Sequence, residues 1–255
     1  MRLSRRAFVA ASATVGLGCG RSVPVSIPQS ERGPGAGFDV VDLTHPLGPS
    51  SPYIHVRGAT FPFLRAPIAT IGERGVYANR WELTEHIGTH VDAPCHFEET
   101  APCLESIPLA DLFAEVVVID VKRRAQANPD TQLEVADLAA WRTKHGPFPA
   151  RSAVLLSSGW SERWPSQSRF ANQDAQGVMR FPGFSRAAVE ELAATPQVLG
   201  IGTDTFSIDP GSDARFEGHR VLSGARKWAL ECLANLDRLP AQGSHLFIGA
   251  PKVEQ

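Results

Sequence analysis

The sequence has no surplus of positive charge. It contains 25 lysines and arginines against 27 aspartates and glutamates, which gives a formal net charge of −2 at pH 7. Proteins that bind nucleic acid through its phosphates need a basic surface. Nucleic acid is therefore not expected as a partner, and a small, uncharged or mildly polar molecule fits the composition better.

Cysteine is also scarce, and no two cysteines form a CxxC pair. The four are Cys19, Cys95, Cys103 and Cys232. Without such a pair, the sequence does not support thioredoxin-like redox chemistry or a zinc ribbon. Cys95 and Cys103 are close enough in the sequence to form a disulfide across a short loop, but two buried free thiols are the preferred interpretation.

No hydrophobic run near the N-terminus is long enough to cross a bilayer. Residues 1–19 instead have the layout of an export signal, in which Arg5 and Arg6 precede a short run of small apolar residues. The pair resembles the twin-arginine signal of exported bacterial proteins, so we expect a periplasmic protein. A chance pair in a cytoplasmic protein is the alternative. The residues GLGC loosely resemble a lipoprotein box, which makes Cys19 a candidate lipid anchor.

The rest of the chain has the pattern of one α/β domain. Residues 20–37 are rich in proline, glycine and serine and predict a flexible linker, followed by a single domain at 38–255. Apolar runs predict strands, and amphipathic stretches between them predict helices. The strands are expected at 38–45, 67–71, 76–83, 115–121, 152–158 and 198–206, and the helices at 134–146 and 184–195. Strands that alternate with helices favour a core with parallel strand pairs.

The stretch HIGTHVDAPCHF concentrates side chains that can bind a metal. It contains His86, His90, Asp92 and His96, and imidazole and carboxylate groups are ligands that Zn²⁺ and Mn²⁺ accept. A glycine, a proline and β-branched residues within the stretch disfavour a helix, so we expect a tight loop that turns the rings inward. Polar residues of a surface turn or a helix cap are the alternative.

Further ligands must come from elsewhere in the sequence. His219 and Glu231 are candidates in the C-terminal part, and spacing alone does not choose between them and the remaining histidines. These are His45, His55, His145 and His245.

The same residues resemble a known family, the cyclase-type metal-dependent hydrolases, which include bacterial kynurenine formamidases and isatin hydrolases. HIGTHVDAPCHF is similar to the family signature HxGTHxDxPxHF. Further similar segments follow in the family's order: DLTHPL at 42–47, SGW at 158–160, GTDTFSIDP at 202–210 and the segment 219–239. The resemblance implies a swivelling β/α/β cyclase-like fold with a mixed sheet, assembled as a homodimer or homotetramer.

The resemblance also implies a role for each side chain of the site. The family's metal ligands correspond to His86, His90, Asp92, His219 and Glu231. They would hold one or two divalent ions, with Zn²⁺ as the first choice and Mn²⁺ as the alternative. The family's catalytic histidine corresponds to His96, and a histidine is suited to carry protons near neutral pH. The implied reaction is hydrolysis of an aryl formamide, a cyclic amide or a lactone by metal-activated water.

Two departures from the family pattern concern the substrate and the end of the chain. Kynurenine formamidases typically have a tryptophan in the loop after the first strand, but SPYIHVRGATFPF at 51–63 has none. Tyr53, His55 and Phe61 are expected to replace its surface. Trp160 and Phe206 are further pocket candidates, and core positions are an equally good interpretation for these two and for Phe61. Family members usually continue past a segment like GAPKVE with one more strand, so this chain is expected to be truncated or to lack that strand.

Two other functions remain open. A non-catalytic periplasmic protein that binds a metal or a small molecule would retain the same ligand set. A serine hydrolase that uses Ser157 or Ser158 is weakly supported, because SSGW lacks the flanking glycines of a nucleophile elbow.

Overall fold

The computed structural model describes residues 31–32 and 39–254. The predicted export signal, including Arg5, Arg6 and Cys19, lies outside the described residues and stays a prediction. No helix among the described residues is both long enough and apolar enough to span a membrane.

The described part of the chain alternates strands and helices, as the sequence pattern predicts. The strands are β1 (Glu31–Arg32), β2 (Asp39–Val40), β3 (Leu64–Ala69), β4 (Ala78–Glu82), β5 (His90–Asp92), β6 (Phe113–Asp120), β7 (Gln132–Leu133), β8 (Ser152–Ser157), β9 (Gly183–Phe184), β10 (Val198–Thr203), β11 (Trp228–Glu231) and β12 (Ser244–Phe247). The helices are α1 (Ile71–Arg74), α2 (Lys122–Ala127), α3 (Val135–His145), α4 (Gln167–Ala171), α5 (Arg186–Ala194) and α6 (Glu217–Gly224).

The central sheet has the strand order β12-β6-β8-β10-β11-β5. From β6 to β11 neighbouring strands run parallel, whereas β12 and β5 are antiparallel at the two edges. The predicted strands 115–121, 152–158 and 198–206 are the adjacent strands β6, β8 and β10. Their central residues are apolar because strands inside a parallel sheet are covered on both faces. The expected single α/β domain with a mixed sheet is confirmed.

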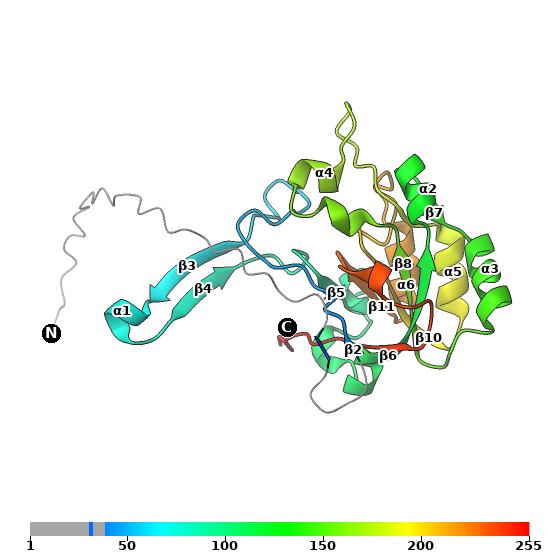
Figure 1. Cartoon of the computed structure of the whole chain (residues 1–255), viewed down its shortest axis with the longest axis horizontal. Coiled ribbons are helices and arrows are strands. Elements are labelled where there is room, and N and C mark those ends of the chain that lie inside the picture. Colours follow the sequence, from blue (N-terminus) through cyan, green and yellow to red (C-terminus); the bar gives the residue numbers. More distant parts are fainter. Residues whose placement is uncertain (1–30, 33–38, 255) are drawn as a thin grey trace.

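Helices pack on one face of the sheet, and loops pack on the other. Helices α3, α5 and α6 lie on one face (Figure 1), where Val117 of β6 packs with Leu138, Leu192 and Leu222. The preceding residue of β6, Val116, packs on the other face against loops and short 3-10 turns. The helical predictions at 134–146 and 184–195 correspond to α3 and α5.

A long hairpin projects from this body (Figure 1). It consists of β3 and β4, which pair antiparallel, with α1 at its tip, and we call residues 64–82 the arm. The arm carries the predicted strands 67–71 and 76–83, although β3 begins earlier, at Leu64. Its large apolar side chains are exposed: Leu64, Ile68, Ile71, Val76, Tyr77 and Trp81. Such a patch on a single chain indicates an interaction surface.

The segment before the arm differs from its prediction. Only Asp39–Val40 of the predicted strand 38–45 is a strand, and it pairs with Glu31–Arg32 inside the predicted linker 20–37. The rest of the segment bonds to other loops instead. The carbonyl of Leu43 accepts from the N–H of Ala234 at 2.9 Å, so its backbone is satisfied without a strand partner.

The prediction of two free thiols at Cys95 and Cys103 is wrong, because the structure joins them in a disulfide. The intervening chain turns back on itself, with the N–H of Ala101 donating to the carbonyl of Glu98 at 2.9 Å. This turn brings the two Cα atoms to 5.0 Å, a separation that a disulfide spans. Spacing along the sequence could not show the turn. Cys232 is a buried free thiol.

Candidate metal centre

The histidine-rich turn leads directly into β5. Gly88 has a φ of 73°, which glycine adopts without strain, and a Cβ there would overlap the side chain of Leu47. The hydroxyl of Thr89 accepts from the N–H of His45 at 2.9 Å and donates to the carbonyl of Cys232 at 2.6 Å. The expected tight loop is therefore present, and it is tied to two other segments of the chain.

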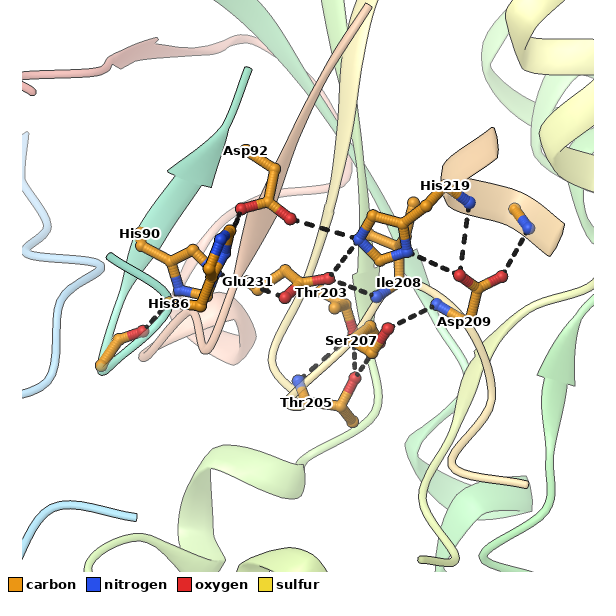
Figure 2. A network of polar contacts seen from close by, with 12 residues as sticks. His86, His90, Asp92, Thr203, Thr205, Ser207, Ile208, Asp209, His219 and Glu231 are labelled. Atoms are coloured by element: carbon orange, nitrogen blue, oxygen red, sulfur yellow. Dashed lines mark hydrogen bonds and ion pairs between the residues drawn. The ribbon is translucent and has the colours of Figure 1, made fainter. Parts of the chain in front are cut away.

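Strand pairing places the ligands of this turn beside a ligand from the C-terminal part. β5 is antiparallel to β11, with His90 opposite Glu231 and Asp92 opposite Ala229. Helix α6 adds His219, whose ring faces the same space (Figure 2). Asp92, His219 and Glu231 are buried. The fold thus brings together residues that are more than a hundred positions apart.

Two histidines and two carboxylates alternate around a common centre. His90 Nε2 lies 3.3 Å from Asp92 Oδ1 and 3.4 Å from Glu231 Oε2. His219 Nε2 lies 3.2 Å from Asp92 Oδ2 and 3.0 Å from Glu231 Oε1. Each carboxylate therefore turns one oxygen toward each histidine, an arrangement suited to a cation at the centre.

His86 and His96 lie on the open side of this group. His86 Nδ1 is 2.8 Å from Asp92 Oδ1, and its side chain is 38% exposed. The His96 ring lies 4.1 Å from the His86 ring and 6.1 Å from the His219 ring, between centroids. Ligand atoms of His86, Asp92 and His96 come within 4.8 Å of one another, as do those of His90, Asp92 and Glu231. Asp92 belongs to both groups, and His96 is close enough to be a ligand or a proton carrier.

Asp209 orients His219, and sequence reasoning did not assign it a role. Asp209 Oδ2 accepts from His219 Nδ1 at 2.6 Å, and the same carboxylate accepts from the backbone N–H groups of Gly218 and His219. This contact leaves His219 Nε2 for the centre, as in the carboxylate–histidine–metal triads of metalloenzymes. The signal available in the sequence was the motif GTDTFSIDP, whose second aspartate is Asp209.

Backbone groups orient two further ligands. The carbonyl of Gly88 accepts from His90 Nδ1 at 2.9 Å, so His90 Nε2 also faces the centre. The N–H of Ile208 donates to Glu231 Oε1 at 2.9 Å. No side-chain pattern in the sequence indicates either contact.

Opposite charges determine the protonation of the site. Burial disfavours the charged form of His90, but Asp92 and Glu231 outweigh it and raise the pKa of His90 to about 10. The pKa of His219 is raised for the same reason against the same opposing burial. Burial would raise the pKa of Asp92 and of Glu231, yet the neighbouring histidines lower both. The two carboxylates are therefore ionised, and they attract a cation or protons.

The residues present fit a divalent metal ion. His90 Nε2 is buried and makes no hydrogen bond, although it lies 3.3 Å from Asp92 Oδ1 and 3.4 Å from Glu231 Oε2. Buried polar atoms normally have a partner, and an ion between them would supply one. The donor set is imidazole nitrogen and carboxylate oxygen without thiolate, which suits ions such as Zn²⁺ and Mn²⁺.

A cleft of about 1660 Å³ opens at this site. His86, His90, Asp92 and His96 line part of it. Its other walls are mainly apolar and include Leu43, Leu47, Leu104, Phe113, Phe247 and Ile248. Pockets for small molecules are usually about 300–1,000 Å³, so this cleft has room for more than a small substrate.

The five predicted substrate contacts lie apart from this cleft. Tyr53 and His55 stack on each other with centroids 4.1 Å apart, in the loop that leads to the arm. Phe61 is half-buried in the same loop. Trp160 and Phe206 are 2% and 3% exposed and belong to a buried aromatic cluster. Their position agrees with the alternative that they are core residues, and none of the five lines the cleft.

The contact between Asp209 and His219 generates a prediction about metal affinity. Asp209→Asn should weaken metal binding by roughly 10- to 100-fold, because the neutral amide no longer increases the basicity of the ring. Competition with a chromophoric chelator measures the affinity. Asp213→Asn is the matched control, since Asp213 accepts from the N–H groups of Arg215 and Glu217 at the same end of α6 without touching a ligand. Equal affinity in both variants would contradict the role of Asp209.

Comparisons with known proteins agree with this geometry. The Cyclase family model, described as "Putative cyclase", matches residues 41–210. An isatin hydrolase of Roseibium aggregatum is 30% identical over 233 residues, which is 85% of this chain and 87% of that protein. A kynurenine formamidase of Paracidovorax citrulli is 28% identical over 218 residues, 82% of this chain and 88% of that protein. The solved structure of isatin hydrolase A from Labrenzia aggregata, bound to benzyl benzoate, matches with a TM-score of 0.79 and 34% identity over 84% of this chain and 88% of that one. The chain therefore belongs to the cyclase family and is a hydrolase built around a site for a divalent metal.

Proposed function

We propose that the protein hydrolyses the C–N or C–O bond of a cyclic amide, an aryl formamide or a lactone. The observation that carries this proposal is the placement of His96 beside the ligand cluster, in the lining of the cleft. The similar proteins are an isatin hydrolase and a kynurenine formamidase, whose names point to amide substrates. Since formylkynurenine is made and used inside cells, the predicted export favours a cyclic amide such as isatin over it.

The ligands His86, His90, Asp92, His219 and Glu231 would hold one or two ions, with Zn²⁺ as our first choice and Mn²⁺ as the second. A divalent ion there supplies an acidified water and polarises the substrate carbonyl. The chain's own residues supply orientation and proton transfer. Asp92 offers one oxygen to each side of the site, while Asp209 fixes the ring of His219.

His96 is the proposed proton carrier. Partial desolvation lowers the pKa of His96 below its usual value, against the opposing charge of Asp92. The imidazole is therefore neutral at neutral pH, so a ring nitrogen can take the proton of the attacking water. The same nitrogen then returns the proton to the leaving nitrogen or oxygen.

His96→Ala tests this role. The variant should lose roughly 10²- to 10⁴-fold in kcat, the usual contribution of a general base, toward whichever member of a panel of isatin, aryl formamides and lactones the wild type hydrolyses. Metal content, measured by mass spectrometry, should stay unchanged. His145→Ala is the control, because His145 is a histidine of α3 that packs on Trp141.

Three outcomes would count against the proposal. Full activity in His96→Ala would remove His96 from the mechanism, and loss of metal from that variant would make it a ligand instead. A fully loaded wild type that turns over no member of the panel would favour the alternative, a binding protein. The serine hydrolase has little support, because the Ser158 hydroxyl donates to buried Asp204 at 2.5 Å.

The assembly is proposed to be a homodimer or homotetramer in which the arm lies against a second copy. The arm exposes apolar side chains, of which Ile68 is 58% and Trp81 67% exposed. The cleft is larger than a small substrate needs, and its wall also exposes apolar groups such as Phe247, at 64%. A second copy of the chain could therefore cover both the apolar arm and the apolar wall of the cleft.

Charged residues on the arm test the assembly. The double variant Ile68→Glu/Trp81→Glu should be monomeric, because an interface core does not accommodate unpaired charges, and light scattering after size exclusion measures the mass. Val178→Glu is the control, since Val178 is exposed but lies outside the arm. A wild type that is already monomeric, or a double variant that assembles normally, would rule out the arm as the interface.

Export by the twin-arginine route is proposed from Arg5 and Arg6, and Cys19 is the proposed site of a lipid anchor. The Cys95–Cys103 disulfide supports it independently, since disulfides persist in oxidising compartments. Arg5→Lys/Arg6→Lys should retain the protein in the cytoplasm, as cell fractionation and immunoblotting would show. Unchanged export of the variant would contradict this route.

A further inference from the structure

The disulfide lies immediately next to the proposed proton carrier. Cys95 directly precedes His96, and both belong to the 3-10 turn Pro94–His96 that follows β5. The bond joins this turn to Cys103, eight positions later. A bridge over so short a loop restricts the unfolded chain less than a long one would. Its main effect is therefore on local geometry.

Hydrogen bonds within the loop between the two cysteines accompany the disulfide. The N–H of Glu98 donates to the carbonyl of Pro94 at 3.2 Å, and the N–H of Ala101 donates to the carbonyl of Glu98 at 2.9 Å. The N–H of Cys95 donates to the carbonyl of Pro102 at 3.3 Å, beside the disulfide. Arg226 Nη1 donates to the carbonyl of Thr100 at 3.3 Å, from an exposed position. The hydrogen bond between Cys95 and Pro102 is long for its type, and the disulfide is the covalent link between the two ends of the loop.

The direction of the His96 ring depends on this backbone. The ring lies against His86 at 4.1 Å and against Phe97 at 4.5 Å between centroids. Phe97 in turn packs on His219, at 4.9 Å. The position of the imidazole at the cleft therefore depends on this ring packing and on the backbone of the turn that carries Cys95 and His96.

We infer that the Cys95–Cys103 disulfide positions His96 for proton transfer, so that the hydrolase works at full rate only when this bond is formed. The inference rests on the proposed hydrolytic function and on the role of His96 in it. Both cysteines are half-buried and thus accessible to a small reductant. A water-soluble phosphine breaks the bond by donating two electrons: it becomes the phosphine oxide with the oxygen of one water molecule, whose two protons go to the two thiolates.

The test compares kcat, KM and metal content in three states of the full-length, metal-loaded protein. These are the oxidised wild type, the wild type reduced with the phosphine, and Cys95→Ser/Cys103→Ser. Alkylation and mass spectrometry confirm the thiol state of each. Reduction should lower kcat roughly 10- to 100-fold, as expected for a displaced catalytic group, with KM within about twofold and metal content unchanged. The serine variant should show the low kcat and no response to the phosphine, which controls for other effects of the reductant.

A further variant separates positioning from a general loss of stability. In His96→Ala, reduction should have no additional effect on the residual kcat, because the residue through which the bond acts is absent. Leu138→Ala is the stability control: Leu138 is buried in α3, away from β5, and its truncation lowers thermal stability without touching the loop. It should retain kcat below its unfolding temperature.

Several results would overturn the inference. These are a wild type that keeps its kcat after proven reduction, loss of metal on reduction, an equal loss of kcat in reduced His96→Ala, and absence of the disulfide from the isolated protein. If the oxidised wild type hydrolyses nothing, the proposed function fails separately. Amide hydrogen exchange then tests whether the disulfide positions the backbone at His96. Reduction should speed exchange at the N–H groups of Cys95 and His96, and unchanged exchange would refute the inference.

Discussion

The pairing of β5 with β11 places two carboxylates, Asp92 and Glu231, in one buried space, and the rest of the site depends on this constraint. A buried charge without compensation costs several kcal/mol. The rings of His90 and His219 provide that compensation in the metal-free chain, and a divalent ion provides it when bound. Behind His219, Asp209 adds one more negative charge, in contact with the far side of the ring. The centre is therefore an alternating network in which removal of one member leaves an unpaired neighbour.

The regular parts of the fold could be predicted because their physical signal is local. β6, β8 and β10 are continuous apolar runs, and the buried face of α5 recurs at helical spacing, with Ser185 as N-cap. The predicted strand 38–45 largely failed because an apolar run also suits a loop that bonds to other loops. The disulfide was missed because it depends on the turn at 98–101, which has no distinctive sequence.

The residues of the candidate site also divide into those that local sequence predicts and those that it does not. His86, His90, Asp92 and His96 were recognisable from their own spacing, since they lie within one short stretch. His219 and Glu231 were candidates from the sequence but could be chosen only by resemblance, because sheet pairing and the packing of α6 bring them to that stretch. The roles of Asp209 and of the Gly88 carbonyl were not predicted, because no residue type or spacing in a sequence marks a group that orients a metal ligand. Trp160 and Phe206 show the opposite problem, because an aromatic residue in a pocket and one in the core look alike in sequence.

The loops that lead to the arm form a part of the molecule distinct from the metal centre. The side chain of Gln167 in α4 bonds to both the N–H and the carbonyl of Tyr53, which fixes that loop to the body. The metal centre, by contrast, is attached through the sheet edge. A change in this loop can therefore leave the geometry of the metal centre intact.

β5 is an edge strand of three residues, His90 to Asp92, and it has one strand neighbour. So short a strand has few ladder hydrogen bonds, and segments of this kind open before the core of a domain does. The metal, held by β5 on one side and by α6 and β11 on the other, would act as a cross-link between an early-opening edge and the stable interior. Loss of the ion would then free the histidine-rich turn and β5 while the parallel strands stay folded. His96 follows β5 directly, so it would move with the segment that is released.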